Sequence, residues 1–211
     1  MRILILVYLI TSSSAFGQSW GLGITGGPAW SRINASNITN EESRTGYHIG
    51  LYGNKHFSQK FSLQGNISYT ALGTKYERLP LNNSGNRVKW EYELNYLILP
   101  VSLNYQPHQL ITFGAGVYSG FLLAFNARRE SRFASTLENP DRSNLRAQDF
   151  GYHFYLSLNY LNTSLGIKYI RAFSELPNSQ LAERLISQAR NSAIQVSVSY
   201  LVFQKGRKDK Q

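Results

Sequence analysis

Apolar and polar residues alternate with a period of two along almost the whole chain after Gln18. In the segment 61–73, one face carries Phe61, Leu63, Gly65, Ile67, Tyr69 and Ala71. The other face carries Ser62, Gln64, Asn66, Ser68 and Thr70. A period of two is typical of a β-strand, because successive side chains point to opposite faces of a sheet. Here one face is apolar with aromatic ends, and the other is polar but uncharged.

The same alternation recurs in seven further segments, so the sequence predicts eight strands, at 20–32, 45–56, 60–77, 88–106, 109–127, 149–160, 162–172 and 191–203. Short turns follow the second, fourth and sixth strands, and long loops follow the others, at 33–44, 78–87, 128–148 and 173–190. This is the organisation of an outer-membrane barrel. We therefore expect an all-β fold: a single eight-stranded antiparallel transmembrane β-barrel, with its termini in the periplasm and its long loops outside.

Composition agrees with strands rather than helices crossing the membrane. The mean hydropathy is −0.30, and no apolar run approaches the roughly 20 residues of a spanning helix. The chain has 14 tyrosines, 11 phenylalanines and 3 tryptophans. It has no cysteine, which excludes disulfide bonds and thiolate zinc sites.

The N-terminus has the features of a secretory signal peptide at 1–17. Arg2 precedes the apolar run 3–10, and Ala15 and Gly17 are the small residues before a cleavage site at Gln18. A short buried N-terminal strand is the alternative. The barrel domain is then 18–203, followed by a basic periplasmic tail at 204–211. The formal charge is +10, but export and the absence of any nucleic-acid-binding motif argue against nucleic acid as a partner.

Proline interrupts the fourth predicted strand at Pro100. Proline cannot donate to a β-ladder, and a closed barrel has no edge strand to accommodate it. We therefore expect a bulge or local twist at Pro100, on the lumen face with Ser102 and Asn104. The lipid-facing stripe of this strand is Leu97, Leu99, Val101, Leu103 and Tyr105. The same face turns polar at Glu91, Glu93 and Asn95, where the strand leaves the lipid.

The segment LNYLILPVSLNY (94–105) resembles the Tyr-Leu-x-Ile-Pro-x-x-x-(Lys/Asn)-Tyr signature of PorT-like outer-membrane β-barrel proteins of Gram-negative bacteria. The match is carried by Tyr96, Leu97, Ile98 or Leu99, Pro100, Asn104 and Tyr105. Leu99 directly precedes the proline, and Asn104 stands where lysine is frequent. The segments GLGITGG (21–27) and FGAGVYSGFLL (113–123) resemble the first and fifth strands of the family.

The resemblance spans essentially the whole mature chain and implies an eight-stranded barrel in the outer membrane. The founding member of the family is associated with a protein secretion system, whereas most relatives have no assigned activity. Many outer-membrane barrels end on an aromatic residue that the assembly machinery reads. Here the last predicted strand ends at Phe203, and a tail follows it.

Histidine supplies the candidate general bases. His48, His56 and His153 fall on predicted lumen faces, and His108 falls on a turn. His153 and Ser157 share a face but are about 13 Å apart along the strand, too far for a hydrogen bond. No HExxH, GxSxG or GxxxxGK[ST] motif occurs. We therefore expect no catalytic residue, metal site or cofactor.

The predicted lumen contains many small residues and one charge. An eight-stranded barrel is about filled by its own side chains, and we expect Tyr52, Tyr118 and Tyr155 to fill the space over the lumen-facing glycines. The lumen charge is Lys168, which needs a partner if it is buried. Glu91 or Glu93 is that partner only if the assignment of faces is wrong by one residue. The alternative is a packing ion pair or a lysine that reaches the rim.

Five arginines lie in the predicted loop between the fifth and sixth strands: Arg128, Arg129, Arg132, Arg142 and Arg146. Arginine pairs bidentately with phosphate, so these residues are candidates for binding lipopolysaccharide phosphates or an acidic partner. An ordinary solvated loop is the alternative. In the last loop, Leu181, Leu185 and Ile186 have helical spacing, which predicts a short amphipathic helix over the barrel mouth.

The sequence thus favours a non-enzymatic outer-membrane barrel that is structural or binds a partner, with an accessory role in secretion suggested by the resemblance alone. The partners expected are outer-membrane lipids including lipopolysaccharide, the barrel assembly machinery and an unidentified envelope protein. A lipid-modifying barrel enzyme and a narrow channel are the alternatives.

Overall fold

The computed structural model describes residues 19–34, 41–78, 88–131, 134–138, 145–176 and 189–206. Its strands are β1 (Trp20–Asn34), β2 (Glu41–His56), β3 (Phe61–Arg78), β4 (Val88–His108), β5 (Ile111–Ser131), β6 (Ala134–Glu138), β7 (Gln148–Tyr160), β8 (Thr163–Ala172) and β9 (Arg190–Lys205). The predicted signal peptide, the predicted helix over the barrel mouth except its last residue, Ala189, and residues 207–211 of the predicted tail lie outside the described residues.

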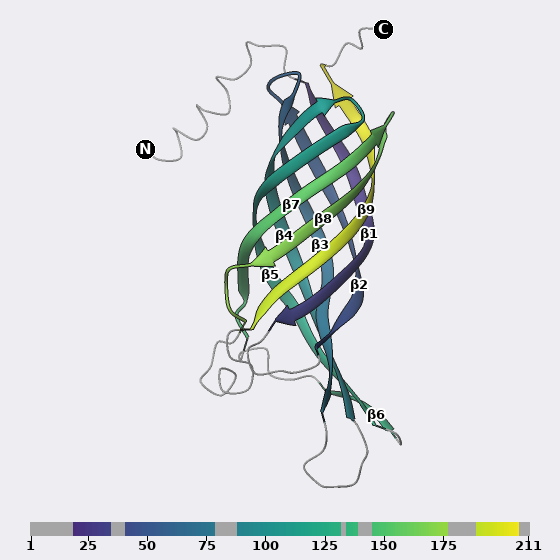
Figure 1. Cartoon of the computed structure of the whole chain (residues 1–211), viewed down its shortest axis with the longest axis vertical. Coiled ribbons are helices and arrows are strands. Elements are labelled where there is room, and N and C mark those ends of the chain that lie inside the picture. The colour runs from purple at the N-terminus through teal and green to yellow at the C-terminus, as the bar shows by residue number, and fades with distance from the viewer. Residues whose placement is uncertain are drawn as a thin grey trace, which may run out of the picture.

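Eight of these strands form a closed antiparallel barrel (Figure 1). Each strand pairs with its neighbour along the chain, except that β5 pairs with β7, and β1 closes the ring by pairing with β9. β6 pairs only with the end of β5 and extends beyond the barrel wall. The predicted fold is therefore confirmed.

The two ends of the barrel differ. The turn end carries the short connections 57–60, 109–110 and 161–162, and there Trp20 of β1 pairs with Lys205 of β9. The loop end carries the long connections and β6, at the bottom of Figure 1. One prediction at the loop end is wrong. The segment 128–148 is not all loop, because β5 runs on to Ser131 and pairs with β6.

The outer surface of the barrel is apolar with aromatic pairs near both ends. Ile24, Leu51, Val117 and Leu158 are each half or more exposed, as are many other outward-facing aliphatic residues. Near the turn end, ring centroids are 5.1 Å apart in both Trp20–Phe203 and Phe61–Tyr105. Towards the loop end, they are 5.9 Å apart in Tyr47–Tyr69 and 5.2 Å in Tyr152–Phe173. An apolar band between two aromatic girdles is the pattern of a lipid-facing barrel surface.

No helix in the described ranges is long and apolar enough to cross a membrane.

The bulge predicted at Pro100 is absent. Val101 pairs with Gly65, and Ile98 pairs with Ser68, so the register between β3 and β4 is the same on both sides of the proline. Pro100 is buried in the lumen, as predicted, and stays paired with Tyr118 of β5. A proline lacks only its own N–H, so the ladder to β3 is interrupted locally and resumes without an extra residue.

A different irregularity lies five residues earlier. Asn95 pairs with Ala124 and Tyr96 pairs with Leu122, so Leu123 is an extra residue of β5. Asn95 and Tyr96 are both buried, so the simple alternation of inward and outward side chains along β4 does not hold from here to the loop end.

Candidate functional site

An apolar core lies inside the barrel at its loop end. Its members are Ile33, Leu72, Leu94, Tyr96, Ile98, Tyr118, Leu122, Leu145, Ile170, Leu176, Ala189 and Ala193. The three residues Leu145, Leu176 and Ala189 come from the ends of the last two long loops. They are held over the mouth by backbone hydrogen bonds, from Arg146 N–H to Leu176 O at 2.9 Å and from Leu176 N–H to Ala189 O at 2.9 Å. These contacts close the lumen at the loop end.

A hydrogen-bond network centred on Asp149 crosses this core. Asp149 is 4% exposed and accepts hydrogen bonds from the Tyr118 hydroxyl at 3.3 Å and from Asn191 Nδ2 at 3.2 Å. The Ser174 hydroxyl donates to its other oxygen, and Asn191 Nδ2 also donates to the Tyr96 hydroxyl at 3.2 Å. The network joins β4, β5, β7, β9 and the segment after β8. A buried carboxylate with several donors is well satisfied, so it strengthens the closed end.

The carboxylates Glu91 and Glu93 belong to a second network at the loop end. Arg44 Nε lies 2.8 Å from Glu91 Oε1, and Arg44 Nη2 lies 2.6 Å from Glu93 Oε2. Arg44 is buried on the lumen side of β2. The assignment of the two glutamates to the outer face is therefore wrong, because both pair with a buried arginine of the lumen. Their partner is Arg44, and neither pairs with Lys168.

The turn end of the lumen instead contains an open polar vestibule of about 520 Å³. It is lined mainly by amide and hydroxyl side chains, including Asn54, Ser62, Gln64, Asn104, Thr112, Ser157, Asn159 and Ser199, with Tyr52 and Tyr155 among them. No aspartate, glutamate, lysine or arginine lines it among the described residues. One hydrogen bond on its wall runs from Asn104 Nδ2 to Gln64 Oε1 at 2.9 Å.

Three tyrosines cover lumen-facing glycines, as predicted. A Cβ atom at Gly23 would meet the ring of Tyr52, one at Gly151 would meet the ring of Tyr118, and one at Gly166 would meet the ring of Tyr155. The small residues therefore accommodate aromatic rings from across the lumen, and little of their space is left empty.

His108 is exposed at the turn end, as predicted, whereas the lumen histidines His48 and His153 make no hydrogen bond to a serine hydroxyl in the described part of the chain. His48 and His153 are buried, as predicted. The Ser157 hydroxyl donates to Asn159 Oδ1 at 3.1 Å and not to a histidine. Within the part of the chain that the structure describes, no group of three or more His, Asp or Glu residues could hold a metal ion. The arrangement thus offers neither an activated nucleophile nor a metal centre.

The structure describes only part of the arginine-rich loop. Arg128 and Arg146 are exposed at the loop end. The Arg129 side chain, Arg132 and Arg142 lie outside the described residues, so their predicted role stays a prediction. Arg128 also lines a small pocket with Arg44, Glu91 and Glu93, about 190 Å³ in volume.

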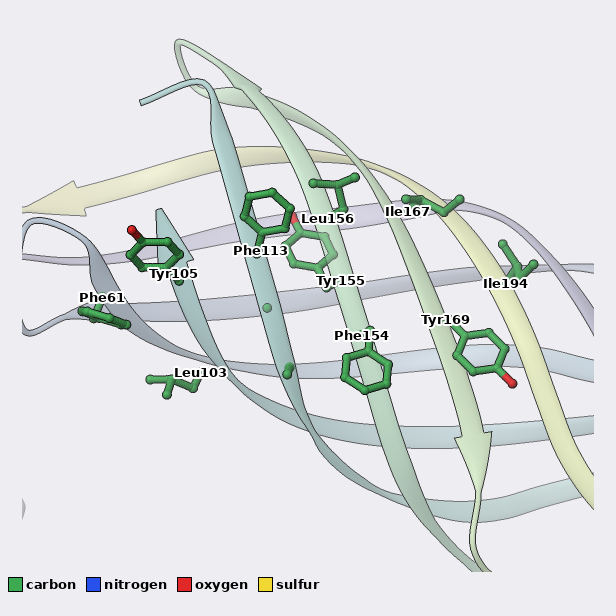
Figure 2. Close-up of a pocket in the computed structure, with 12 residues that line it drawn as sticks. Phe61, Leu103, Tyr105, Phe113, Phe154, Tyr155, Leu156, Ile167, Tyr169 and Ile194 are labelled. Atoms are coloured by element: carbon green, nitrogen blue, oxygen red, sulfur yellow. The ribbon is translucent and has the colours of Figure 1, made fainter. Parts of the chain in front are cut away.

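A shallow apolar hollow of about 580 Å³ lies on the outer surface. Figure 2 shows Phe113 of β5 beside Leu156 of β7 at this hollow, with Phe154 farther along β7. Larger side chains surround Ala115 on this face, which accounts for the depression. It lies in the apolar band, so it is a surface that lipid chains would cover.

Comparisons with known proteins agree with this architecture. The family described as outer membrane protein beta-barrel domain matches residues 16–178. Neisserial surface protein A (NspA) is similar over 86% of this chain and 97% of its own, with 11% identity and a TM-score of 0.51. Ail, the attachment invasion locus protein of Yersinia pestis, was solved in complex with the heparin analogue sucrose octasulfate; it covers 87% of this chain and 97% of its own, with 14% identity and a TM-score of 0.49.

OprG of Pseudomonas aeruginosa covers 87% of this chain and 94% of its own, with 14% identity and a TM-score of 0.43. No curated protein sequence matches the chain significantly. At 11% identity, NspA bears on the fold alone.

Proposed function

Because this chain belongs to the outer membrane protein beta-barrel domain family, we propose that it is a closed, non-enzymatic barrel that supports the envelope or binds a partner there. In this proposal the turn end faces the periplasm and the loop end faces outward. The observation that carries it is the apolar core across the loop end of the lumen. The resemblance to PorT-like barrels suggests one such partner: a protein of a secretion system, to which this barrel would be an accessory component.

The apolar core argues against a narrow channel. Leu94 and Leu122 are each 1% exposed in the lumen. A hydrated ion would need to separate these side chains and break the network around Asp149 to pass. Water and ions do not enter a well-packed apolar region of this kind. The vestibule at the turn end is thus a pocket with one entrance.

The vestibule also argues against a lipid-modifying enzyme. A barrel hydrolase needs a histidine in contact with its nucleophile, whereas the Ser157 hydroxyl on the vestibule wall bonds to Asn159. Lipid profiling of a deletion strain tests this part of the proposal. Unchanged acylation of lipid A and phospholipids is expected, and a changed acylation pattern would favour the enzyme.

Partners are proposed from the chemistry of each surface. Outer-membrane lipids cover the apolar band, and the barrel assembly machinery inserts the chain. The exposed guanidinium groups of Arg128 and Arg146 suit the phosphates of lipopolysaccharide or an acidic envelope protein.

Two measurements test the proposal. In planar bilayers the purified barrel should give no stable conductance steps, because its loop end is closed. The double variant Arg128→Glu/Arg146→Glu should retain less lipopolysaccharide on purification than the wild type. Lys60→Glu is the matched control, since Lys60 is exposed at the turn end and should not change retention. Stable conductance, or equal losses in both variants, would contradict the proposal.

A further inference from the structure

Lys168 is a half-buried cation on the lumen face of the barrel. It lies on β8, in register with Tyr155 of β7 and Gln195 of β9. Its Nζ atom lies 5.9 Å from the centroid of the Tyr155 ring. No carboxylate in the described ranges of the chain lies close enough to compensate its charge. The nearest carboxylates of the lumen are engaged at the loop end, by Arg44 and by the donors around Asp149.

Two buried imidazoles of the lumen lie near Lys168. His153 is two residues from Tyr155 on β7, and His48 comes from β2 on another part of the wall. They are 2% and 4% exposed, respectively, and both lie within electrostatic range of Lys168. Nδ1 of each ring, Nε2 of His48 and the hydroxyl of Thr70 beside His48 have no hydrogen-bond partner among the described residues.

Lys168 has no carboxylate partner, and the imidazoles and Thr70 have polar atoms without hydrogen-bond partners, in the described part of the chain. A buried ammonium group is costly unless an opposite charge or several acceptors surround it. The Tyr155 ring face alone is a weak partner for a cation. A neutral imidazole offers one N–H donor, and a hydroxyl offers another. A cation that lies near hydrogen-bond donors and has no carboxylate beside it is the arrangement that an anion site requires.

We propose that Lys168, His48 and His153 form a binding site for a small monovalent anion of the chloride class. Lys168 supplies the charge, and the imidazoles and Thr70 supply hydrogen-bond donors. The ion enters from the turn end, because the vestibule reaches Tyr155 and has no acidic lining residue in the described part of the chain. The apolar core blocks entry from the loop end. A small ion fits this route, since Tyr52 and Tyr155 narrow the inner end of the vestibule.

The first test needs only the wild-type protein. Crystals of the full folded barrel are grown with bromide in place of chloride, and anomalous scattering locates the ions. A bromide peak within hydrogen-bond distance of Lys168 Nζ in the lumen is expected. Bromide bound only on the outer surface would overturn the proposal.

The second test measures the effect of the anion on stability in micelles. Unfolding temperatures are compared in chloride and in gluconate, a bulky anion, at equal ionic strength. At a tenfold excess over its dissociation constant, chloride should raise the wild-type unfolding temperature by roughly 3–6 °C. Lys168→Met should lose this dependence and should be the more stable protein in gluconate, because it has no buried charge to compensate.

Lys75→Met is the matched control. Lys75 is also a strand lysine, but its side chain is 47% exposed at the loop end, so this variant should keep the wild-type response to chloride. Lys168→Gln replaces Lys168→Met if the apolar variant fails to fold. Equal chloride responses in the wild type and the Lys168 variant would overturn the proposal and indicate a lysine solvated by water.

Discussion

The loop end of the lumen holds an apolar core of leucine, isoleucine, alanine and tyrosine beside two charged networks, whereas the turn end is lined mainly by serine, asparagine, glutamine and threonine. Strand β4 carries both apolar and polar lumen-facing residues within a short distance. Its lumen face runs from Leu94 and Ile98 in the apolar core, past Pro100, to Ser102 and Asn104 on the polar side. On the outer face, Leu99, Val101 and Leu103 stay apolar throughout.

The difference shows how one strand can carry two independent patterns. Because side chains alternate between faces, the lipid-facing positions can stay apolar along the whole strand. The polarity of the lumen-facing positions changes independently along the barrel axis. The apolar half of the lumen acts like the core of a soluble protein and holds the barrel closed. The polar half leaves a vestibule whose side chains are spaced too widely to fill it.

The largest expected effect of a single substitution is the loss of a side chain from the apolar half. Leu94→Ala removes a leucine that is 1% exposed and should lower the free energy of unfolding by about 2–5 kcal/mol. Leu201→Ala is the control, because Leu201 is a partly exposed leucine of the vestibule wall. It should cost less than about 1 kcal/mol. Urea unfolding in micelles, followed by the heat-modifiable gel shift, measures both, and similar losses would contradict the comparison.

The Asp149 network gives the next largest effect. Asp149→Ala leaves the buried donors of Tyr118, Asn191 and Ser174 without their acceptor, which should cost about 1–3 kcal/mol. Asp149→Asn keeps one acceptor oxygen and should cost less. The same unfolding measurement applies. An equal loss in the two variants would mean that the charge of Asp149, and not its hydrogen bonding, stabilises the closed end.

A glycine pair tests the packing of the two halves with the smallest chemical change. A Cβ atom at Gly151 would collide with the Arg171 carbonyl and with the Tyr118 ring, so Gly151→Ala should cost about 1–3 kcal/mol. At Gly166 the nearest atom belongs to the Tyr155 ring, and the backbone is 3.4 Å away. Because that ring borders the vestibule and has room to move, Gly166→Ala should cost less. The reverse order of unfolding midpoints would refute this reading of the vestibule.

The smallest effect on stability is expected at Pro100, which lies between the apolar and the polar half of the lumen. Pro100→Ala restores one N–H that can donate to β3, and the register already matches on both sides. The free energy of unfolding should change by no more than about 1 kcal/mol, with the gel shift of a folded barrel retained. Failure of this variant to fold would show that the proline has a role in assembly that the intact register does not reveal.

The period-two pattern predicted the eight strands to within a few residues and placed His48, His153 and Lys168 on the lumen face. The apolar core at the loop end was missed. A signal for it existed, because Leu72, Ile98 and Leu122 have the parity of the polar face. This signal is ambiguous, since an apolar residue on that face can also indicate an error in register.

Other features could not be read from the alternation. The turn of Glu91 and Glu93 towards Arg44 depends on a break in the alternation of β4 near Asn95, which leaves no mark in composition. The pairing of β5 with β6 continues through polar, charged sequence without a clear period of two. Pro100 was expected to require a bulge, but the loss of one donor is tolerated when the flanking pairs hold the register.

The most direct test of the central claim uses the absence of cysteine from the chain. Thr112 and Leu122 lie on the lumen face of the same strand, β5, the first in the vestibule and the second in the apolar core. Single variants Thr112→Cys and Leu122→Cys are treated in the folded state with a small water-soluble thiol reagent. The account predicts rapid labelling of Thr112→Cys and protection of Leu122→Cys until the barrel is unfolded. Comparable labelling rates at the two positions would show that water reaches both halves of the lumen, and the closed loop end would then be wrong.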